Sequence, residues 1–327
     1  MTRTLKALLL LAVSFSAAAQ SAEWKALNDE MRSLYQKGQY ERAQVVAKQA
    51  LDLAIQQKGP DDLSVAVSAS NLAALHDAER QYAQAEPLFA RALAIRERAL
   101  GPDHPDVASS LNNLASLYRS QGRYGEAEPL YARALQIRLK VHGSGHPDVA
   151  TSLNNVAALY RAQGRYAEAE PLYVKSLEIR EKLLGTEHRD VAVSLNNLAT
   201  LYDAQGKYFE AEPLYKRSLA IREKTLGREH LDVAASLSSL GGMYQVQRAY
   251  DKAEPLLMRS MVIREKLLPP DHPDAVANRH ALWALFMSQD KFALAEQYQL
   301  PGQVTPTEEQ RRRLSIPMPS PGRSAPK

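Results

Sequence analysis

The segment His104-Pro105-Asp106-Val107-Ala108 occurs again, unchanged, at positions 146–150. The separation is 146 − 104 = 42 residues, and counting back by the same step leads to Asp62 and then to Gln20, without insertion or deletion. Related segments follow at further steps of 42 residues and begin at His188, His230 and His272. A fixed period of this length predicts an array of structural repeats, each packed mainly against its neighbours.

Each copy contains two helical patterns. In the copy that begins at His104, the apolar residues 111, 114, 115 and 118 lie on one face of a helix, because their spacing follows its period of about 3.6 residues. A turn at Gln121-Gly122-Arg123 separates this helix from a second one, which ends near His142. Two helices in every copy predict an all-α fold.

The conserved spacing within a copy matches the pattern of the tetratricopeptide repeat, in which small residues let two helices approach closely and aromatic residues fill the space around them. The matching positions are Leu111, Leu114, Ala115, Tyr118, Gly122, Tyr124, Ala127, Tyr131 and Ala134. The resemblance implies a right-handed α-solenoid over residues 20–300, with about six helix pairs and a degenerate C-terminal repeat. Tyr166, which is equivalent to Tyr124, is expected to be buried between helices.

The period of 42 residues exceeds the usual value of about 34 for this repeat class, and residues 62–292 resemble the kinesin light chain type. The resemblance is carried by Leu153-Asn154-Asn155, Tyr160, Gln163-Gly164-Arg165-Tyr166, Glu168-Ala169-Glu170-Pro171-Leu172 and Ile179-Arg180-Glu181-Lys182. It implies a concave groove that holds extended peptides. Kinesin light chains have a heptad coiled coil before their repeats, and here a different segment stands in that place, so kinesin binding is not implied.

That N-terminal segment has the features of a signal peptide. Arg3 and Lys6 precede a short apolar run, and Ala17-Ala18-Ala19 fits a cleavage site before Gln20. We therefore expect residues 1–19 to be removed and the protein to be periplasmic or secreted; an uncleaved membrane anchor is the alternative. At the other end, residues 301–327 are rich in Pro, Ser and Arg and are expected to form a disordered basic tail.

Composition excludes several classes of protein. The net charge is +4, with 41 basic and 37 acidic residues interspersed, so nothing favours nucleic acid as a partner. There is no cysteine, which excludes disulfides, thiolate metal sites and a lipidated N-terminal cysteine. After the signal peptide, no stretch is long and apolar enough to span a membrane.

The periodic histidines at 104, 146, 188, 230 and 272 do not predict a metal site. Equivalent positions on neighbouring repeats lie roughly 8–10 Å apart, whereas a metal ion needs its ligands at about 2.0–2.1 Å. We interpret each as a loop residue before a helix. The recurring Glu126 and Glu128 type carboxylates and the Arg138 and Arg180 type cations are interpreted as partners of the helix dipole. No catalytic residue, metal ligand or cofactor site is expected.

The candidate binding residues lie on the first helices. On a helical wheel, the first Asn of each recurring pair shares one flank with a small residue and a polar residue, and this flank should face the groove. The predicted peptide-binding residues are Asn112, Ser116 and Arg119; Asn154 and Arg161 around Ala158; Asn196 and Asp203 around Thr200; and the second members Asn113, Asn155 and Asn197. Asn can donate to and accept from a peptide backbone; alternatively, one Asn of each pair bonds between repeats.

The sequence therefore predicts a non-catalytic scaffold that binds an extended segment of another protein in its groove. Arg119 and Arg161 are neighbours along this surface, with Asp77 and Asp203 on either side, so the ligand segment should carry an acidic residue near its middle. The first alternative is a structural subunit of an envelope assembly that packs through its convex face or its ends. The remote alternative is an enzyme or a metal protein.

Overall fold

The computed structural model describes residues 22–303, and every regular element in this range is an α-helix. The expected signal peptide, residues 1–19, and residues 304–327 of the expected tail lie outside the described part of the chain. The helices are α2 (Ala22–Gln36), α3 (Tyr40–Lys58), α4 (Leu63–Ala78), α5 (Tyr82–Leu100), α6 (Pro105–Ser120), α7 (Tyr124–His142), α8 (Pro147–Ala162), α9 (Tyr166–Leu184), α10 (Arg189–Ala204), α11 (Tyr208–Leu226), α12 (Leu231–Val246), α13 (Tyr250–Leu267), α14 (Pro273–Met287) and α15 (Phe292–Glu296).

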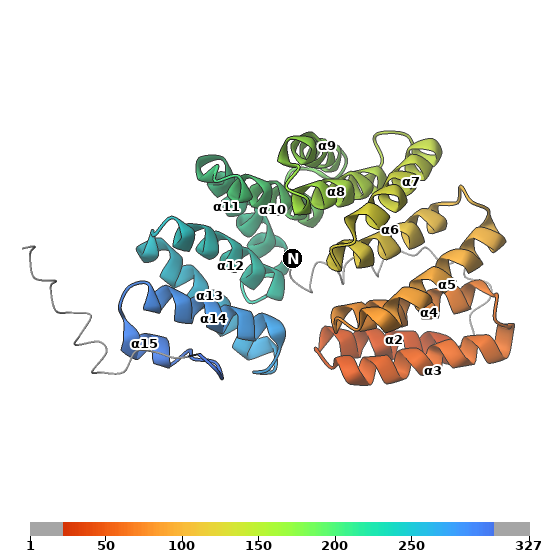
Figure 1. The fold of residues 1–327 in the computed structure, drawn as a ribbon, viewed down its shortest axis with the longest axis horizontal. Helices are drawn as coiled ribbons and strands as arrows, with labels where there is room; N and C mark the ends of the chain where they lie inside the picture. Colours follow the sequence, from red (N-terminus) through yellow and green to blue (C-terminus); the bar gives the residue numbers. More distant parts are fainter. Residues whose placement is uncertain (1–21, 304–327) are drawn as a thin grey trace, which may run out of the picture.

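Successive helices pack in pairs, from α2–α3 to α12–α13, and the shorter α14 and α15 follow. The pairs stack into a curved superhelix in which α6, α8, α10 and α12 lie on the inner side and α7, α9 and α11 on the outer side (Figure 1). The contacts agree with this curvature, because neighbouring first helices such as α6 and α8 touch each other more extensively than neighbouring second helices do. The predicted all-α tetratricopeptide-repeat superhelix is confirmed.

The first helices from α4 to α14 each begin at a capping side chain. Asp62 Oδ1 accepts a hydrogen bond of 2.8 Å from the backbone N–H of Ser64, and His146 Nδ1 accepts one of 3.2 Å from that of Asp148. The periodic histidines therefore precede helices, as predicted, and also supply a cap that the sequence analysis did not assign. A ring nitrogen that accepts an N–H carries no proton, so each neutral ring has its proton on Nε2.

The turn inside each helix pair needs a left-handed residue. Gly122 fills this position with φ 75°, and glycine adopts this conformation without strain. In other copies the same place is taken by Arg80 (φ 60°), Arg248 (φ 58°) and Asp290 (φ 56°). At these three positions the Cβ atom makes the left-handed conformation sterically unfavourable.

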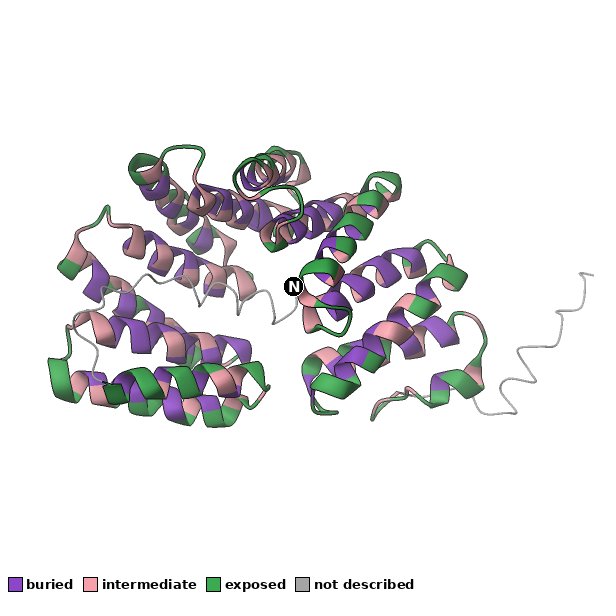
Figure 2. Cartoon of the chain, turned by 180° about the vertical axis from the view of Figure 1, so that it is seen from behind, coloured by how far each residue is buried: buried purple, intermediate pink, exposed green. Residues whose placement is uncertain are grey.

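Figure 2 shows that buried residues lie along the helices where they pack against each other, and the core contains the small and aromatic residues of the repeat pattern. Ala115 and Ala127 are completely buried where the helices approach, and Tyr131 and Tyr173 are almost completely buried beside such contacts. The expectation for Tyr166 was wrong: this residue is only half-buried and packs at the edge of the cluster around Tyr173. It begins α9, where its outer side remains open to solvent.

The arginines assigned to the helix dipole are instead buried between repeats. Arg138 Nη1 donates to Ser152 Oγ (3.0 Å) and to the backbone oxygen of Asp148 (3.2 Å), both in the next repeat. Burial lowers the pKa of Arg138, and the nearby Asp148 carboxylate opposes this effect. The same arginine–serine bond recurs in three further copies, as Arg96–Ser110 at 2.5 Å and as Arg180–Ser194 and Arg222–Ser236 at 2.7 Å each.

The recurring glutamates also form bonds that the dipole interpretation did not include. Glu128 Oε2 lies 3.1 Å from Arg165 Nη1 of the next repeat, and Glu86 Oε2 lies 2.6 Å from Arg123 Nη1 in the equivalent contact. Glu126 pairs with Arg123 at 2.6 Å, and this hydrogen bond lowers the pKa of Glu126. The Glu128–Arg165 and Glu86–Arg123 pairs join neighbouring repeats, whereas the Glu126–Arg123 pair lies within one repeat.

The first and last repeats touch each other. Tyr40 Oη lies 2.9 Å from His272 Nε2, and His272 is buried, unlike the other histidine caps. Because Nδ1 of His272 accepts the N–H of Asp274, Nε2 carries the proton and donates to Tyr40. Among residues 22–303, no helix combines the length and the apolar character needed to cross a bilayer.

Candidate peptide-binding face

The candidate site lies on the inner side of the superhelix, near the C-terminal ends of α4, α6, α8 and α10 (Figure 1). Four charged residues occupy equivalent positions there, one on each helix, because each follows the previous one by 42 residues. We call them the charged row: Asp77, Arg119, Arg161 and Asp203. Asp77 is buried and the other three are half-buried, so the row is partly shielded from water.

A tyrosine of the paired second helix supports each of three members of the charged row. Tyr131 interacts with Arg119, Tyr173 with Arg161, and Tyr215 with Asp203. The tyrosine rings are buried in the core, so only their hydroxyl ends are available to the row. The repeat pattern predicted only a packing role for Tyr131; the constant distance of 12 residues between each tyrosine and the charged position is the sequence signal for this second role.

Burial and neighbouring charges change the titration of these groups in different directions. Burial raises the pKa of Asp203, although a hydrogen bond from Tyr215 opposes it. Burial also raises the pKa of Tyr173, which the two nearby arginines partly offset. Burial acts to lower the pKa of Arg119, but the contacts with Tyr131 and Asp77 outweigh it and raise the pKa. Arg119 therefore stays charged.

Arg161 is the member of the row with the clearest capacity for a ligand. Its Nε atom is buried without a hydrogen-bond partner among residues 22–303, and no ion pair joins its guanidinium group to a carboxylate of these residues. Its neighbour is the Tyr173 hydroxyl, which carries no charge. A half-buried guanidinium without a carboxylate partner can bind a carboxylate of a ligand by donating two parallel hydrogen bonds to it.

The first asparagines are more enclosed than the helical wheel suggested. Asn112 is 2% exposed, and Asn154 and Asn196 are 9% exposed. The second asparagines, Asn113, Asn155 and Asn197, are half-buried. The helical wheel predicted that the first asparagine of each pair faces the groove and that the second lies opposite the core. In the structure, the packing of neighbouring repeats covers much of both side chains.

Among the predicted binding residues, one asparagine contact joins neighbouring repeats, and Asn71 and Asn28 form the equivalent contact at 2.9 Å nearer the N-terminus. Asn197 Nδ2 donates to Asn154 Oδ1 at 2.9 Å, so the alternative of a structural bond between repeats applies to this pair. Asn112 differs, because both polar atoms of its amide are buried without a hydrogen-bond partner among the described residues. A buried amide of this kind costs free energy until it finds a partner.

The positions between the asparagines and the charged row carry small side chains. Ser116 and Thr200 are half-buried and Ala158 is buried. Thr200 Oγ1 donates to the backbone oxygen of Asn196 at 2.7 Å and accepts a bond of 3.1 Å from Tyr215. The inner face thus combines short side chains with polar groups whose positions are fixed by hydrogen bonds.

Comparison with known proteins places this chain among repeat proteins. A family model described as a tetratricopeptide repeat matches residues 32–97, 71–140, 112–182, 148–224 and 191–247, and a second model of the same description matches residues 233–274. No curated protein gives a significant match.

Among solved structures, a kinesin light chain protein of Podosopora anserina with nearly identical TPR-like repeats is 28% identical, with a TM-score of 0.52; the match covers 64% of this chain and 99% of that one. BtubC (BKLC) from P. vanneervenii is 28% identical with a TM-score of 0.53, over 74% of this chain and 92% of that one. A Rap protein complexed with Competence and Sporulation Factor shares the fold at 16% identity, with a TM-score of 0.58 over 85% and 90% of the two chains.

Proposed function

Because the chain belongs to the tetratricopeptide-repeat family, and its repeats are of the kinesin light chain type, we propose that it is a scaffold that binds an extended segment of a partner protein on its inner face. The family fold typically mediates protein–protein interaction without catalysis. The observation that carries the proposal is Arg161, a half-buried cation on the inner face without a carboxylate partner in the described chain.

The chemistry of the charged row favours an acidic residue near the middle of the bound segment. Arg119 and Arg161 stand on neighbouring helices, α6 and α8, and an acidic position follows at each end of this pair, Asp77 and Asp203. A carboxylate between the two guanidinium groups would gain charge-assisted hydrogen bonds. The acidic ends would repel further carboxylates, so they restrict where on the ligand the charge can be.

The asparagines would hold the backbone of the same segment. Amides offer both a donor and an acceptor to a peptide group, and the Asn112 amide has both functions unused in the described structure. Asn154 and Asn197 must give up or share their mutual bond to take part. Asn112 and its neighbour Asn155 are therefore the first residues to test for backbone contacts.

A selected-peptide experiment tests the proposal. A displayed library of random extended peptides is enriched on the wild-type protein, and the recovered peptides are measured by calorimetry against Arg161→Gln. We expect a central Asp or Glu in the enriched sequences and at least about tenfold weaker binding to the variant, or 1.4 kcal/mol. Lys182→Gln is the matched control, because it removes the same charge from an exposed outer position. Equal affinity for both variants would contradict the proposal.

The alternative of an envelope subunit that packs through its outer surface has one observation in its favour. Phe209, at the start of α11, is 93% exposed, and a fully exposed aromatic ring is a common anchor in protein interfaces. If the enriched peptides bind Arg161→Gln as tightly as the wild type, but a native partner binds Phe209→Ser more weakly than the wild type, the outer surface is the contact.

We also propose that the scaffold works outside the cytoplasm, after removal of residues 1–19. The support is the sequence of this segment, with its basic start, short apolar run and alanine-rich cleavage site. Intact mass of the protein from its native compartment should correspond to a chain beginning at Gln20. A mass that includes Met1 would contradict export by cleavage.

A further inference from the structure

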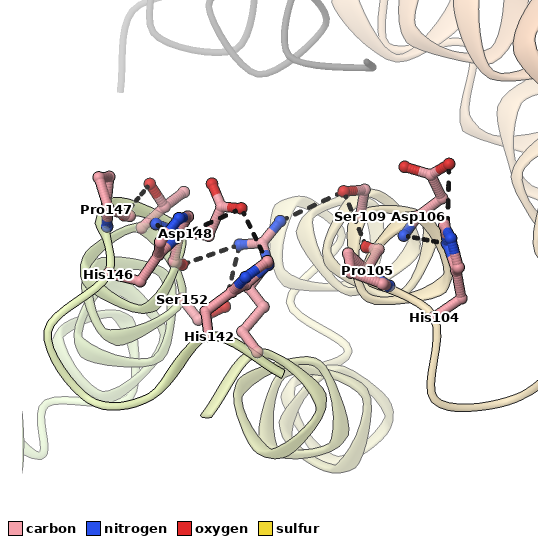
Figure 3. A network of polar contacts seen from close by, with 11 residues as sticks. His104, Pro105, Asp106, Ser109, His142, His146, Pro147, Asp148 and Ser152 are labelled. Carbon is pink, nitrogen blue, oxygen red and sulfur yellow. Dashed lines mark hydrogen bonds and ion pairs between the residues drawn. The ribbon is translucent and has the colours of Figure 1, made fainter. Parts of the chain in front are cut away.

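We infer that His142, His146 and Asp148 form a binding site for a divalent transition-metal ion of the Zn²⁺ class, at the junction of α7 and α8. One ligand atom from each residue lies within 4.8 Å of the others, and within residues 22–303 no other such group occurs. Figure 3 shows the three side chains side by side, where α7 ends and α8 begins.

The geometry identifies which atoms would bind the ion. Asp148 Oδ2 lies 3.6 Å from His142 Nε2 and 3.7 Å from His146 Nδ1. Two ligands of a tetrahedral ion are about 3.3 Å apart when each metal–ligand bond is near 2.0–2.1 Å. The two observed separations are slightly larger, so the aspartate oxygen and each of the two nitrogens need to approach each other by less than about 1 Å.

The Nε2 atom of His142 is buried and has no hydrogen-bond partner among residues 22–303, which is unfavourable for a nitrogen that can accept or donate. Four other copies have leucine at the equivalent position, Leu100, Leu184, Leu226 and Leu268, and the first copy has Lys58. The histidine–aspartate pair recurs, for example as His104 and Asp106 at 3.8 Å, and His142 adds the third ligand in one loop alone.

The loop itself allows the small movement that binding requires. The rings of His142 and His146 stack at a centroid distance of 4.1 Å with planes 15° apart. Because the lone pairs lie in the ring planes, one ring has to turn before both can face one ion. His142 is the last residue of α7, and Gly143-Ser144-Gly145 follows, where other copies have an acidic residue in place of Gly145. No atom of another residue approaches within 4 Å of the Cβ position at Gly145.

The surroundings select the kind of ion. Arg138 donates to the backbone oxygen of Asp148, and this cation, together with the positive end of α8, opposes a second positive charge. Ions that depend on carboxylate oxygens, such as Mg²⁺ and Ca²⁺, would gain too little from one aspartate. Imidazole nitrogens favour Zn²⁺, Ni²⁺ and Cu²⁺, and the side chains are 23% to 45% exposed, so water can complete the coordination.

Binding also requires His146 to change its role. Its Nδ1 atom accepts the N–H of Asp148 and caps α8, and it would exchange this long bond for the ion. The ion would then join the last residue of one repeat to the first turn of the next. The periodic histidines were not expected to bind a metal ion because they lie in different repeats; this site instead uses two histidines at the ends of one loop and depends on His142, which is not one of the periodic histidines.

Calorimetric titration of the tag-free protein with ZnCl₂ tests this inference. We expect one saturable Zn²⁺ per chain and no comparable binding of MgCl₂. His142→Leu, which restores the residue of the sister copies, and His146→Asn, which keeps a good helix cap, should each weaken Zn²⁺ binding at least tenfold. His188→Asn is the matched control in a sister loop and should bind as the wild type does.

Circular dichroism of each variant shows whether it is folded. The two site variants remove different ligands, so a folding defect in one of them is not expected in the other. Replacing His142 leaves the cap of α8 in place, whereas replacing His146 leaves His142 in place. Absence of saturable Zn²⁺ binding in the wild type would overturn the proposal. Tight binding that survives both site variants would overturn it as well, because the ion would then be held elsewhere.

Discussion

The two tyrosines of α9 give a sharp test of the packing. Tyr173 is 1% exposed, whereas Tyr166, seven residues earlier on the same helix, is half-buried. Truncation of a fully buried aromatic side chain costs about 3–5 kcal/mol, because it removes apolar burial and leaves a cavity. We expect Tyr173→Ala to lower the free energy of unfolding by this amount, and Tyr166→Ala by roughly half of it or less.

Urea unfolding followed by circular dichroism measures both values under one set of conditions. The comparison between two variants of one helix is more reliable than either number alone, because the unfolded chain is nearly the same. The repeats are coupled to their neighbours, so a loss at α9 can split the transition into two steps. Equal destabilisation by the two substitutions, or a larger effect at Tyr166, would refute the packing described here.

The conservative variant Tyr173→Phe separates packing from polar contact. It keeps the ring in the core but removes the hydroxyl that faces Arg161. We expect a loss of about 1 kcal/mol, the usual net value of one such hydrogen bond. A loss as large as that of Tyr173→Ala would mean that the ring contributes little and that the cavity argument is wrong.

Three further predictions rest on single positions. Arg248→Gly should raise the free energy of unfolding by about 1 kcal/mol, measured in urea, because φ 58° is strained for arginine. Burial raises the pKa of Asp203, so the folded state holds this proton more tightly than the unfolded state. The associated stability is present at low pH and is lost as the pH rises through the folded-state pKa of Asp203. The melting temperature of Asp203→Asn should therefore be higher than that of the wild type at pH 7 but not at pH 3. Tyr40→Phe removes the bond to His272 between the first and last repeats, and should broaden the distance distribution between spin labels at Lys37→Cys and Asp271→Cys.

Much of the fold follows from the period alone. The spacing of Leu111, Leu114, Ala115 and Tyr118 predicts a helix, and the fixed step of 42 residues predicts that its neighbours are copies of it. All four residues lie on the first helix of a pair in the structure, with Leu111 and Ala115 completely buried. Local periodicity is sufficient here because each copy repeats the same local packing.

Contacts between copies were harder to predict. A helical wheel shows which face of one helix is apolar, but Arg138 reaches Ser152 across the boundary between two repeats, and Glu128 reaches Arg165 in the same way. These bonds depend on the angle at which one pair stacks on the next. The same angle decides that Asn112 is covered and that Tyr166 is left at an edge. A single sequence does not contain this angle in any local pattern.

The positions that break the period are therefore where partner binding should be sought. Residues that recur along most of the array already have a structural partner: a capping histidine such as His146 accepts a backbone N–H of its own repeat, and a buried arginine such as Arg138 bonds to the next repeat. The charged row changes sign along the array, from Asp77 through Arg119 and Arg161 to Asp203, and stacking requires no such change. His142 likewise replaces a leucine that packing would favour. Because the scaffold is the same in each copy, a ligand can recognise one register on it only through residues that differ between copies.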